Sequence, residues 1–206
     1  QEVKLLDAES DGRKKYYIGF FPLGLIIVLL FASRASYQPH QKPSEKSIAV
    51  LPFKNDSEDA SNIYLINGLM DAVLNNLQKI KDLKVISRTS VEKYRNTDKS
   101  IAEIADELGV AYFVEGSGQK VGDQILLNVQ LIEAQTDRHI WGEQYDRKLT
   151  DIFKIQGEVA SKIAHQVEAR ITPDEQKRID EIPTHDMLAY DYFLQGLDLL
   201  YQPSEE

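Results

Sequence analysis

The segment SIAVLPF, residues 47–53, constrains the fold of this chain more than any other part of its sequence. It is a dense run of apolar and β-branched residues, which is typical of a strand buried on both faces of a sheet. Such a strand needs other elements to cover it, so the pattern of the residues that follow decides the fold class.

Three downstream segments have apolar residues at the spacings of three and four that indicate amphipathic helices. A glycine at position 109 is expected to end the second helix and Pro173 the third. The predicted apolar faces are, in chain order, Leu65, Leu69, Val73, Leu77 and Ile80; Ile101, Ile104, Ala105 and Leu108; and Ile152, Ile155, Val159, Ile163 and Val167.

Shorter segments complete the α/β pattern. LKVIS (residues 83–87) predicts a second strand and VEKY (residues 91–94) a short helix, whereas residues 111–119, 124–134 and 138–147 predict a meander of three strands. Strands joined through helices should be parallel and those joined by tight turns antiparallel. The sequence therefore predicts an α/β domain of three layers, with a mixed five-stranded sheet covered by helices.

An uncharged segment near the start predicts a transmembrane helix over residues 16–33. Tyr16–Ala32 follows three basic residues, Arg13 to Lys15, and has about the length that spans a bilayer. The basic residues favour a cytoplasmic location for residues 1–15, and the polar residues 34–46 are expected to be a linker. The alternative is a secretory signal that is cleaved near Ala35.

The composition excludes several classes of function. A net charge of −9 argues against a nucleic-acid-binding face, and the absence of cysteine excludes disulfides and thiolate catalysis. The glycine-rich EGSGQKVGD (residues 115–123) is followed by a strand rather than by the helix that a phosphate loop needs. His139 and Glu143 lie too far apart on a strand to share a metal ion. We therefore expect no catalytic residues, metal or cofactor; a hydrolase using Ser87 and His139 is a distant alternative.

Five residues are candidates for a structural or binding role. Thr89 and Glu92 have the spacing of a helix-capping box. Arg88 follows a parallel strand at the carboxyl end, where it could pair with a carboxylate or contact an anionic ligand or partner. Trp141 and Tyr145 lie on one face of the third meander strand, near the edge of the sheet. They could anchor a partner or pack under the last helix of the domain.

The end of the chain differs from this domain. Residues 173–186 are charged and predict a connector, whereas residues 187–206 predict one more amphipathic helix. Its apolar face has no evident partner in the sequence, so we expect the helix to be loosely held and to provide an interaction surface. That predicted face consists of Leu188, Phe193, Leu197 and Leu200.

Several segments together resemble a known family: SIAVLPFKNDSED, YLINGLMDAVLNNL, LKVISRTSVEKY, IAEIADELGVAYFVEGS, LIEAQTDRHIWGEQYDR and LTDIFKIQGEVASKIA. Residues 47–172 resemble the TolB amino-terminal-like domain, which is related to the FlgO-like domain of bacterial single-pass membrane proteins. AYDYFLQGLDLL, residues 189–200, resembles the first helix of a tetratricopeptide repeat. Asn67 and Gly118 depart from the family, which often has an Asp and an apolar residue there.

The resemblance implies a fold similar to the anticodon-binding fold, with tetratricopeptide repeats after it. It also implies a cytoplasmic winged-helix regulator or nucleotide cyclase upstream. The expected function is a non-catalytic sensory or protein-interaction module of a membrane-anchored bacterial signalling protein. Residues 47–206 would be periplasmic and bind other proteins through the repeats and the sheet edge. The alternative is an envelope scaffold without signalling output.

Overall fold

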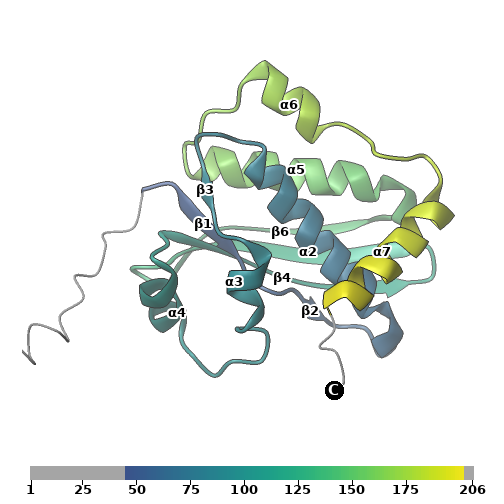
Figure 1. Cartoon of the computed structure of the whole chain (residues 1–206), viewed down its shortest axis with the longest axis horizontal. Coiled ribbons are helices and arrows are strands. Elements are labelled where there is room, and N and C mark those ends of the chain that lie inside the picture. Colours follow the sequence, from purple (N-terminus) through teal and green to yellow (C-terminus); the bar gives the residue numbers. More distant parts are fainter. Residues whose placement is uncertain (1–44, 202–206) are drawn as a thin grey trace, which may run out of the picture. The chain divides into compact units, whose positions relative to one another are not determined.

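The computed structural model describes residues 45–201 of the chain, which fall within one compact unit of residues 41–206. The predicted membrane helix and most of the predicted linker lie outside the described residues. In the described part, no helix is both long and apolar enough to cross a membrane. The elements follow the predicted order, with one extra strand, one extra α-helix and two short 3-10 helices (Figure 1).

A single mixed sheet organises the domain. Its central order is β3-β1-β4-β5-β6, formed by Lys84–Val85, Ser47–Val50, Tyr112–Val121, Gln124–Glu133 and Arg138–Lys148. β1 is parallel to β3 and β4, and the β4-β5-β6 meander is antiparallel, as predicted. The predicted number of strands is wrong: β2 (Lys54–Asn55) pairs with β4 as a sixth strand. The sequence gives little signal for β2 because two polar residues carry no periodicity.

Two long helices, α2 (Ile63–Gln78) and α5 (Ile152–Gln166), pack against each other and against the sheet. All ten residues of the two predicted apolar faces of these helices are buried, so the helical spacing identified the core correctly. On β5, the buried Leu127, Val129 and Leu131 alternate with exposed Asn128 and half-buried Gln130. One face of the meander therefore belongs to the core and the other is partly exposed to solvent, as the alternation predicts.

The predicted end of the third long helix is wrong. α5 ends at Gln166, and Glu168 takes a left-handed φ of 54°, which breaks the helix before Pro173. Pro173 instead begins a new helix, α6 (Pro173–Ile179), capped by a reciprocal pair of hydrogen bonds between Thr172 and Glu175. The predicted connector thus contains a helix, because proline is favoured at the first helical position as well as beyond a helix end.

The shorter helices lie on both sides of the meander in the sequence. η1 (Ala60–Asn62) leads into α2, α3 (Arg88–Glu92) contacts β1, and η2 (Leu149–Asp151) leads into α5. α4 (Ile101–Leu108) begins with a capping box between Ser100 and Glu103 and ends at Gly109, which has the left-handed φ of 63° that favours glycine. Gly109 is the predicted stop of this helix.

Candidate functional site

The last helix, α7 (Met187–Tyr201), is docked on the domain. Figure 1 shows it beside α2, with which it is in contact. Its Tyr190 and Leu194 are buried, and Leu194 lies directly over Gly68 of α2. The prediction of a loosely held helix is therefore wrong. The helix packs through a side other than its most apolar one.

Polar contacts between side chains surround the buried centre of this interface, which we call the α7 dock. The Tyr64 hydroxyl donates to Asp191 at 2.6 Å, and the Asn67 amide donates to Asp198 at 2.6 Å. Burial and Asp191 together raise the pKa of Tyr64 to about 12, so its hydroxyl stays protonated. The α7 dock comprises Tyr190, Asp191, Leu194, Asp198 and Tyr201 on the helix and Tyr64, Asn67, Gly68, Arg88 and Gln156 on the domain.

Arg88 connects α3 with both α2 and α7. Its side chain is 7% exposed and donates to Asp71 of α2, with Glu92 3.5 Å away. Its guanidinium also lies 3.7 Å from the centre of the Tyr201 ring, a distance at which a cation is attracted to an aromatic face. The sequence left open whether Arg88 pairs with a carboxylate of the chain or contacts an anionic ligand or partner. In the structure it pairs with the Asp71 carboxylate.

The Asp71 carboxylate, which pairs with Arg88, has a raised pKa. Burial raises the pKa of Asp71 to about 6, and the nearby Arg88 opposes this increase. A buried ion pair costs desolvation that its attraction only partly repays. The ion pair joins α2 to α3, and Arg88 also contacts the Tyr201 ring of α7.

The predicted cap at Thr89 and Glu92 is wrong. α3 begins at Arg88 with Ser87 as its N-cap, and the Ser87 side chain makes no capping hydrogen bond. Thr89 is exposed. The two carboxylate oxygens of Glu92 lie 2.5 Å from Nε of Arg95 and 3.5 Å from Nε of Arg88. Attraction to two guanidinium groups draws the Glu92 carboxylate away from the helix start.

The two candidate anchor aromatics have different environments. Tyr145 is 1% exposed and lies beneath α5, where the Lys162 amine is 5.3 Å from its ring centre. A partner cannot contact a ring that α5 already covers, so of the two alternatives for Tyr145 the surface anchor is wrong and packing under the last helix of the domain is confirmed. Trp141 is half-buried against the core and keeps some accessible surface.

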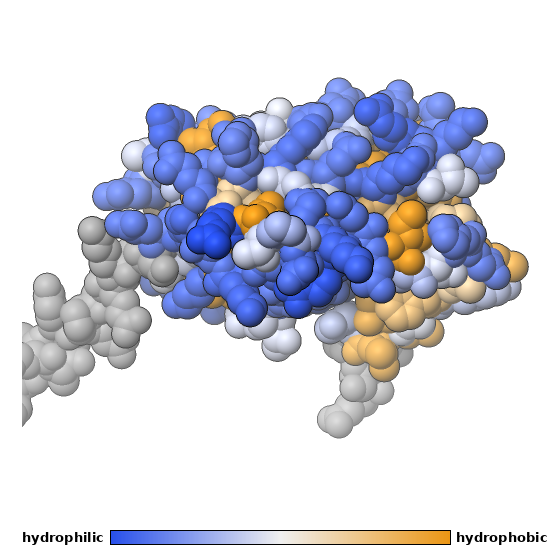
Figure 2. Space-filling view, turned by 90° about the horizontal axis from the view of Figure 1, so that it is seen from above, coloured by the Kyte–Doolittle hydropathy of each residue, from blue (hydrophilic) through white to orange (hydrophobic). Residues whose placement is uncertain are grey.

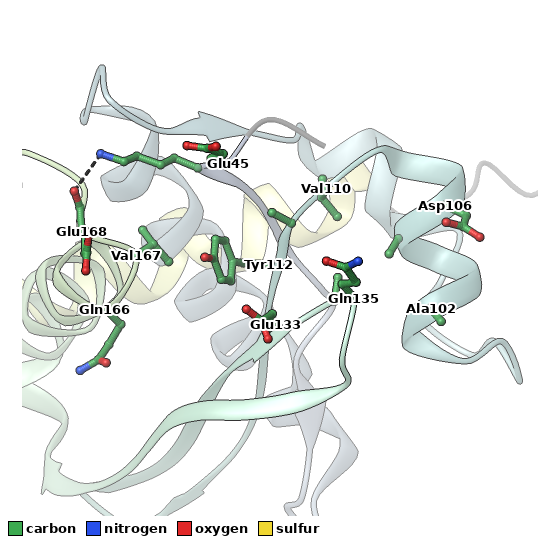
Figure 3. A pocket seen from close by; sticks show the side chains of 14 residues that line it. Glu45, Ala102, Asp106, Val110, Tyr112, Glu133, Gln135, Gln166, Val167 and Glu168 are labelled. Carbon is green, nitrogen blue, oxygen red and sulfur yellow. Dashed lines mark hydrogen bonds between the residues drawn. The ribbon is translucent and has the colours of Figure 1, made fainter. Parts of the chain in front are cut away.

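A second feature is a cavity of about 720 Å³ between α4, the end of β5 and the end of α5. Figure 3 shows carboxylates from four segments around it, with a hydrogen bond of 2.8 Å from the Lys46 amine to the backbone oxygen of Glu168. The carboxylates belong to Glu45, Asp106, Glu133 and Glu168. Among residues 45–201, no three metal-ligating side chains lie close enough together to hold an ion.

The outer side of α7 is an exposed apolar face. Figure 2 shows a mostly hydrophilic surface with hydrophobic atoms gathered at the lower right, over α7. Among the described residues, only Val121 and Ile182 are large exposed apolar side chains outside this helix. Those within it are Leu188, Tyr192, Phe193, Leu199, Leu200 and Tyr201. Leu188, Phe193 and Leu200 of the predicted face are thus exposed.

Sequence reasoning missed the residues that hold α7 in place. Gly68 was the available signal, because a glycine in the middle of an otherwise regular helix indicates a close approach by another element. A Cβ atom at this position would lie 2.5 Å from a methyl carbon of Leu194, so the glycine makes room for that side chain.

Comparison with curated proteins identifies a relative that is much longer than this chain. The chain is 36% identical over 168 residues to "Putative adenylate cyclase 3" of Rhizobium meliloti (strain 1021), which covers 82% of this chain and 29% of that protein. The chain thus spans less than a third of the length of this curated relative.

Two solved structures are also similar to this chain. TolB from Acinetobacter baumannii is 21% identical, with a TM-score of 0.45 over 63% of this chain and 29% of that one. Lipoprotein GNA1162 from Neisseria meningitidis is 15% identical, with a TM-score of 0.42 over 62% of this chain and 99% of that one.

The family comparison covers more than half of the chain. Residues 44–162 match the model described as "HilA/YgeH-like transcriptional regulator, second domain". The matched segment begins just before β1 and ends within α5, so it contains the whole sheet. The chain belongs to the family of HilA/YgeH-like transcriptional regulator second domains.

Proposed function

We propose that this chain is a non-catalytic protein-interaction module of a membrane-anchored bacterial signalling protein. The observation that carries the proposal is the apolar face of α7, which is exposed although the opposite side of the same helix is firmly docked. A contiguous apolar surface of this kind is typical of an interaction site. A docked helix also presents that surface in a fixed orientation.

The relatives support a module whose chemistry lies elsewhere. One match is named for a transcriptional regulator and another for an adenylate cyclase, of which this chain covers 29%. Two different outputs joined to one kind of domain favour a shared regulatory or binding role. We propose a regulator or cyclase domain upstream, in the cytoplasm.

The proposed occupant of the exposed face is the next helix of a tetratricopeptide repeat. Ala189 and Gly196 lie among the exposed apolar residues, and a Cβ at Gly196 would have no neighbour within 4 Å. Small residues between large ones let a second helix approach closely. Repeat units need such stacking to bury their apolar faces.

The location rests on the sequence before the described domain. Basic residues precede the uncharged segment Tyr16–Ala32 and are less concentrated after it, which favours a cytoplasmic start and a periplasmic domain. We therefore propose one membrane span, with residues 47–206 in the periplasm.

Cysteine labelling tests both parts of the proposal, because the chain has no cysteine of its own. Val121→Cys at the end of β4 and Leu199→Cys on α7 replace side chains that are 57% and 67% exposed. A membrane-impermeant maleimide should label Val121→Cys in intact cells that express the protein from its own gene. Leu199→Cys should react readily in the purified chain of residues 1–206 but be protected in cells.

Two outcomes would contradict the proposal. Labelling of Val121→Cys only after the membrane is permeabilised would place the domain in the cytoplasm. Equal reactivity of Leu199→Cys in cells and in the purified chain would show that nothing covers the apolar face of α7.

A further inference from the structure

β6 is a long and open edge of the sheet. In the described sheet it pairs only with β5, whereas the opposite edge is the two-residue strand β3. Most of its eleven residues are exposed, and it contains no proline. Long unpaired edges attract other strands unless the chain protects them.

The backbone direction on β6 follows from one hydrogen bond at its end. The Leu149 N–H donates to the Asp123 oxygen at 2.7 Å, and the register with β5 is regular from there to Trp141. Because antiparallel partners alternate, Trp141, Glu143, Tyr145 and Arg147 bond to β5. The N–H and C=O groups of the residues between them, Gly142, Gln144, Asp146 and Lys148, point away from the sheet.

The side chains of β6 are complementary to a second copy of the same strand. In an antiparallel pair centred on Tyr145, Glu143 of each copy lies opposite Arg147 of the other. Trp141 then lies opposite Leu149, and both are half-buried apolar residues packed at the margin of the core. Glu143 already accepts from Lys162 of α5 at 2.6 Å, which fixes its carboxylate on that face.

Registers centred on either of the charged residues two positions from Tyr145 are less favourable. Centring the pair on Glu143 would place two carboxylates opposite each other, and centring it on Arg147 would place two guanidinium groups opposite each other. Like charges directly opposite destabilise a strand pair. Centring the pair on Tyr145 avoids both conflicts.

We propose that β6 pairs with β6 of a second copy about a two-fold axis at Tyr145, which joins two sheets into one. Gly142 and Lys148 of opposite copies would exchange backbone hydrogen bonds, as would Gln144 and Asp146. The interface is isologous, as in most homodimers. It leaves the exposed face of α7 free, so it is independent of the proposed interaction through that helix.

Reversal of single charges tests this interface. Arg147→Glu and Glu143→Arg each place like charges opposite each other at two symmetric positions, whereas the double variant restores opposite charges. Arg138→Glu is the matched control, because Arg138 is an exposed arginine on the same strand outside the paired segment. Sedimentation equilibrium of the full chain in density-matched detergent gives the dissociation constant of each dimer.

We expect the wild type and the control to form dimers with similar dissociation constants. Each single variant should weaken the dimer by at least about tenfold, and the double variant should recover most of that loss. A monomeric wild type, or single variants with an unchanged dissociation constant, would overturn the proposal, as would a double variant as weak as the single ones.

A cross-link provides a second test that leaves the Glu143–Lys162 pair intact. Chains with Gln144→Cys and chains with Asp146→Cys, mixed and oxidised, should form a disulfide between opposite copies within the reach of that bond. Each variant alone should cross-link far less, because its cysteines lie diagonally across the axis. Equal cross-linking in the separate and mixed samples would refute the register.

Discussion

Replacing Gly68 by alanine tests whether α7 is docked as the structure shows. In the interior of a helix, alanine is favoured over glycine by roughly 0.8–1 kcal/mol, so the change would stabilise α2 if nothing lay above it. In the structure, the added Cβ would lie 2.5 Å and 2.9 Å from the two methyl carbons of Leu194. Overpacking of a buried site costs roughly 1–3 kcal/mol.

The competition between these effects predicts the result. Leu194 is 2% exposed, so its methyl groups can yield to the new methyl only by taking another rotamer among buried neighbours or by lifting α7 away from α2. We therefore expect Gly68→Ala to accelerate amide hydrogen exchange throughout α7, while α2 and the sheet remain protected. Exchange measured by mass spectrometry on α7 peptides follows this opening directly.

Two further variants separate the contact from general effects of alanine. Leu194→Ala removes the colliding methyl groups, so adding Gly68→Ala to it should have little further effect on α7, a non-additive result expected of residues in contact. Gly196→Ala is the matched control, because its Cβ would meet nothing within 4 Å. Unchanged exchange of α7 in Gly68→Ala, with a higher melting temperature, would refute the docked arrangement.

Three other predictions concern the charge of Asp71, the caps of two short helices and the absence of a required metal. The pKa of Asp71 is raised to about 6 in the folded protein from 3.8. Between about pH 4 and pH 6 the folded state therefore binds more protons than the unfolded state, and the contribution of Asp71 to stability falls as the pH rises through this window. Urea titrations should thus show the wild type gaining stability relative to Asp71→Asn from pH 7 to pH 4; a constant difference would exclude this pKa. Ser100→Ala should lower the free energy of unfolding by about 1 kcal/mol through loss of the α4 cap, whereas Thr89→Ala should have almost no effect in the same titration; equal losses would restore the cap predicted from sequence. EDTA should leave the melting temperature of the chain unchanged, and a large decrease would reveal a structural metal.

The sheet and the two long helices were predictable because their signal is local. Leu69 and Val159 lie in the core since each falls on an apolar face of period 3.6, and the β5 residues alternate as a half-exposed strand requires. The turn at Gly122 takes a left-handed φ of 60°, as its glycine suggests. Such features depend on a few adjacent residues, whatever packs above them.

Helix boundaries were less predictable because equivalent motifs compete with tertiary contacts. Ser100 and Glu103 form a capping box, but Thr89 and Glu92 have the same spacing and do not. The difference is Arg88, which together with Arg95 attracts the Glu92 carboxylate. The end of α5 is similar, since its left-handed residue is Glu168 rather than a glycine, and nothing in the sequence marks that position.

The orientation of α7 explains why the apolar pattern did not predict that this helix is docked on the domain. The docked side includes Asp191 and Asp198, which accept hydrogen bonds from Tyr64 and Asn67. A search for apolar spacing therefore does not find this side of the helix. Only Tyr190 and Leu194 of this helix are buried. Gly68 lies beneath Leu194 and lets the two helices come close, so the buried apolar area of α7 is small. Because polar partners hold the helix, its more hydrophobic side stays exposed. Because α7 docks through one side and keeps its apolar side exposed, it can bind a second helix while it remains docked.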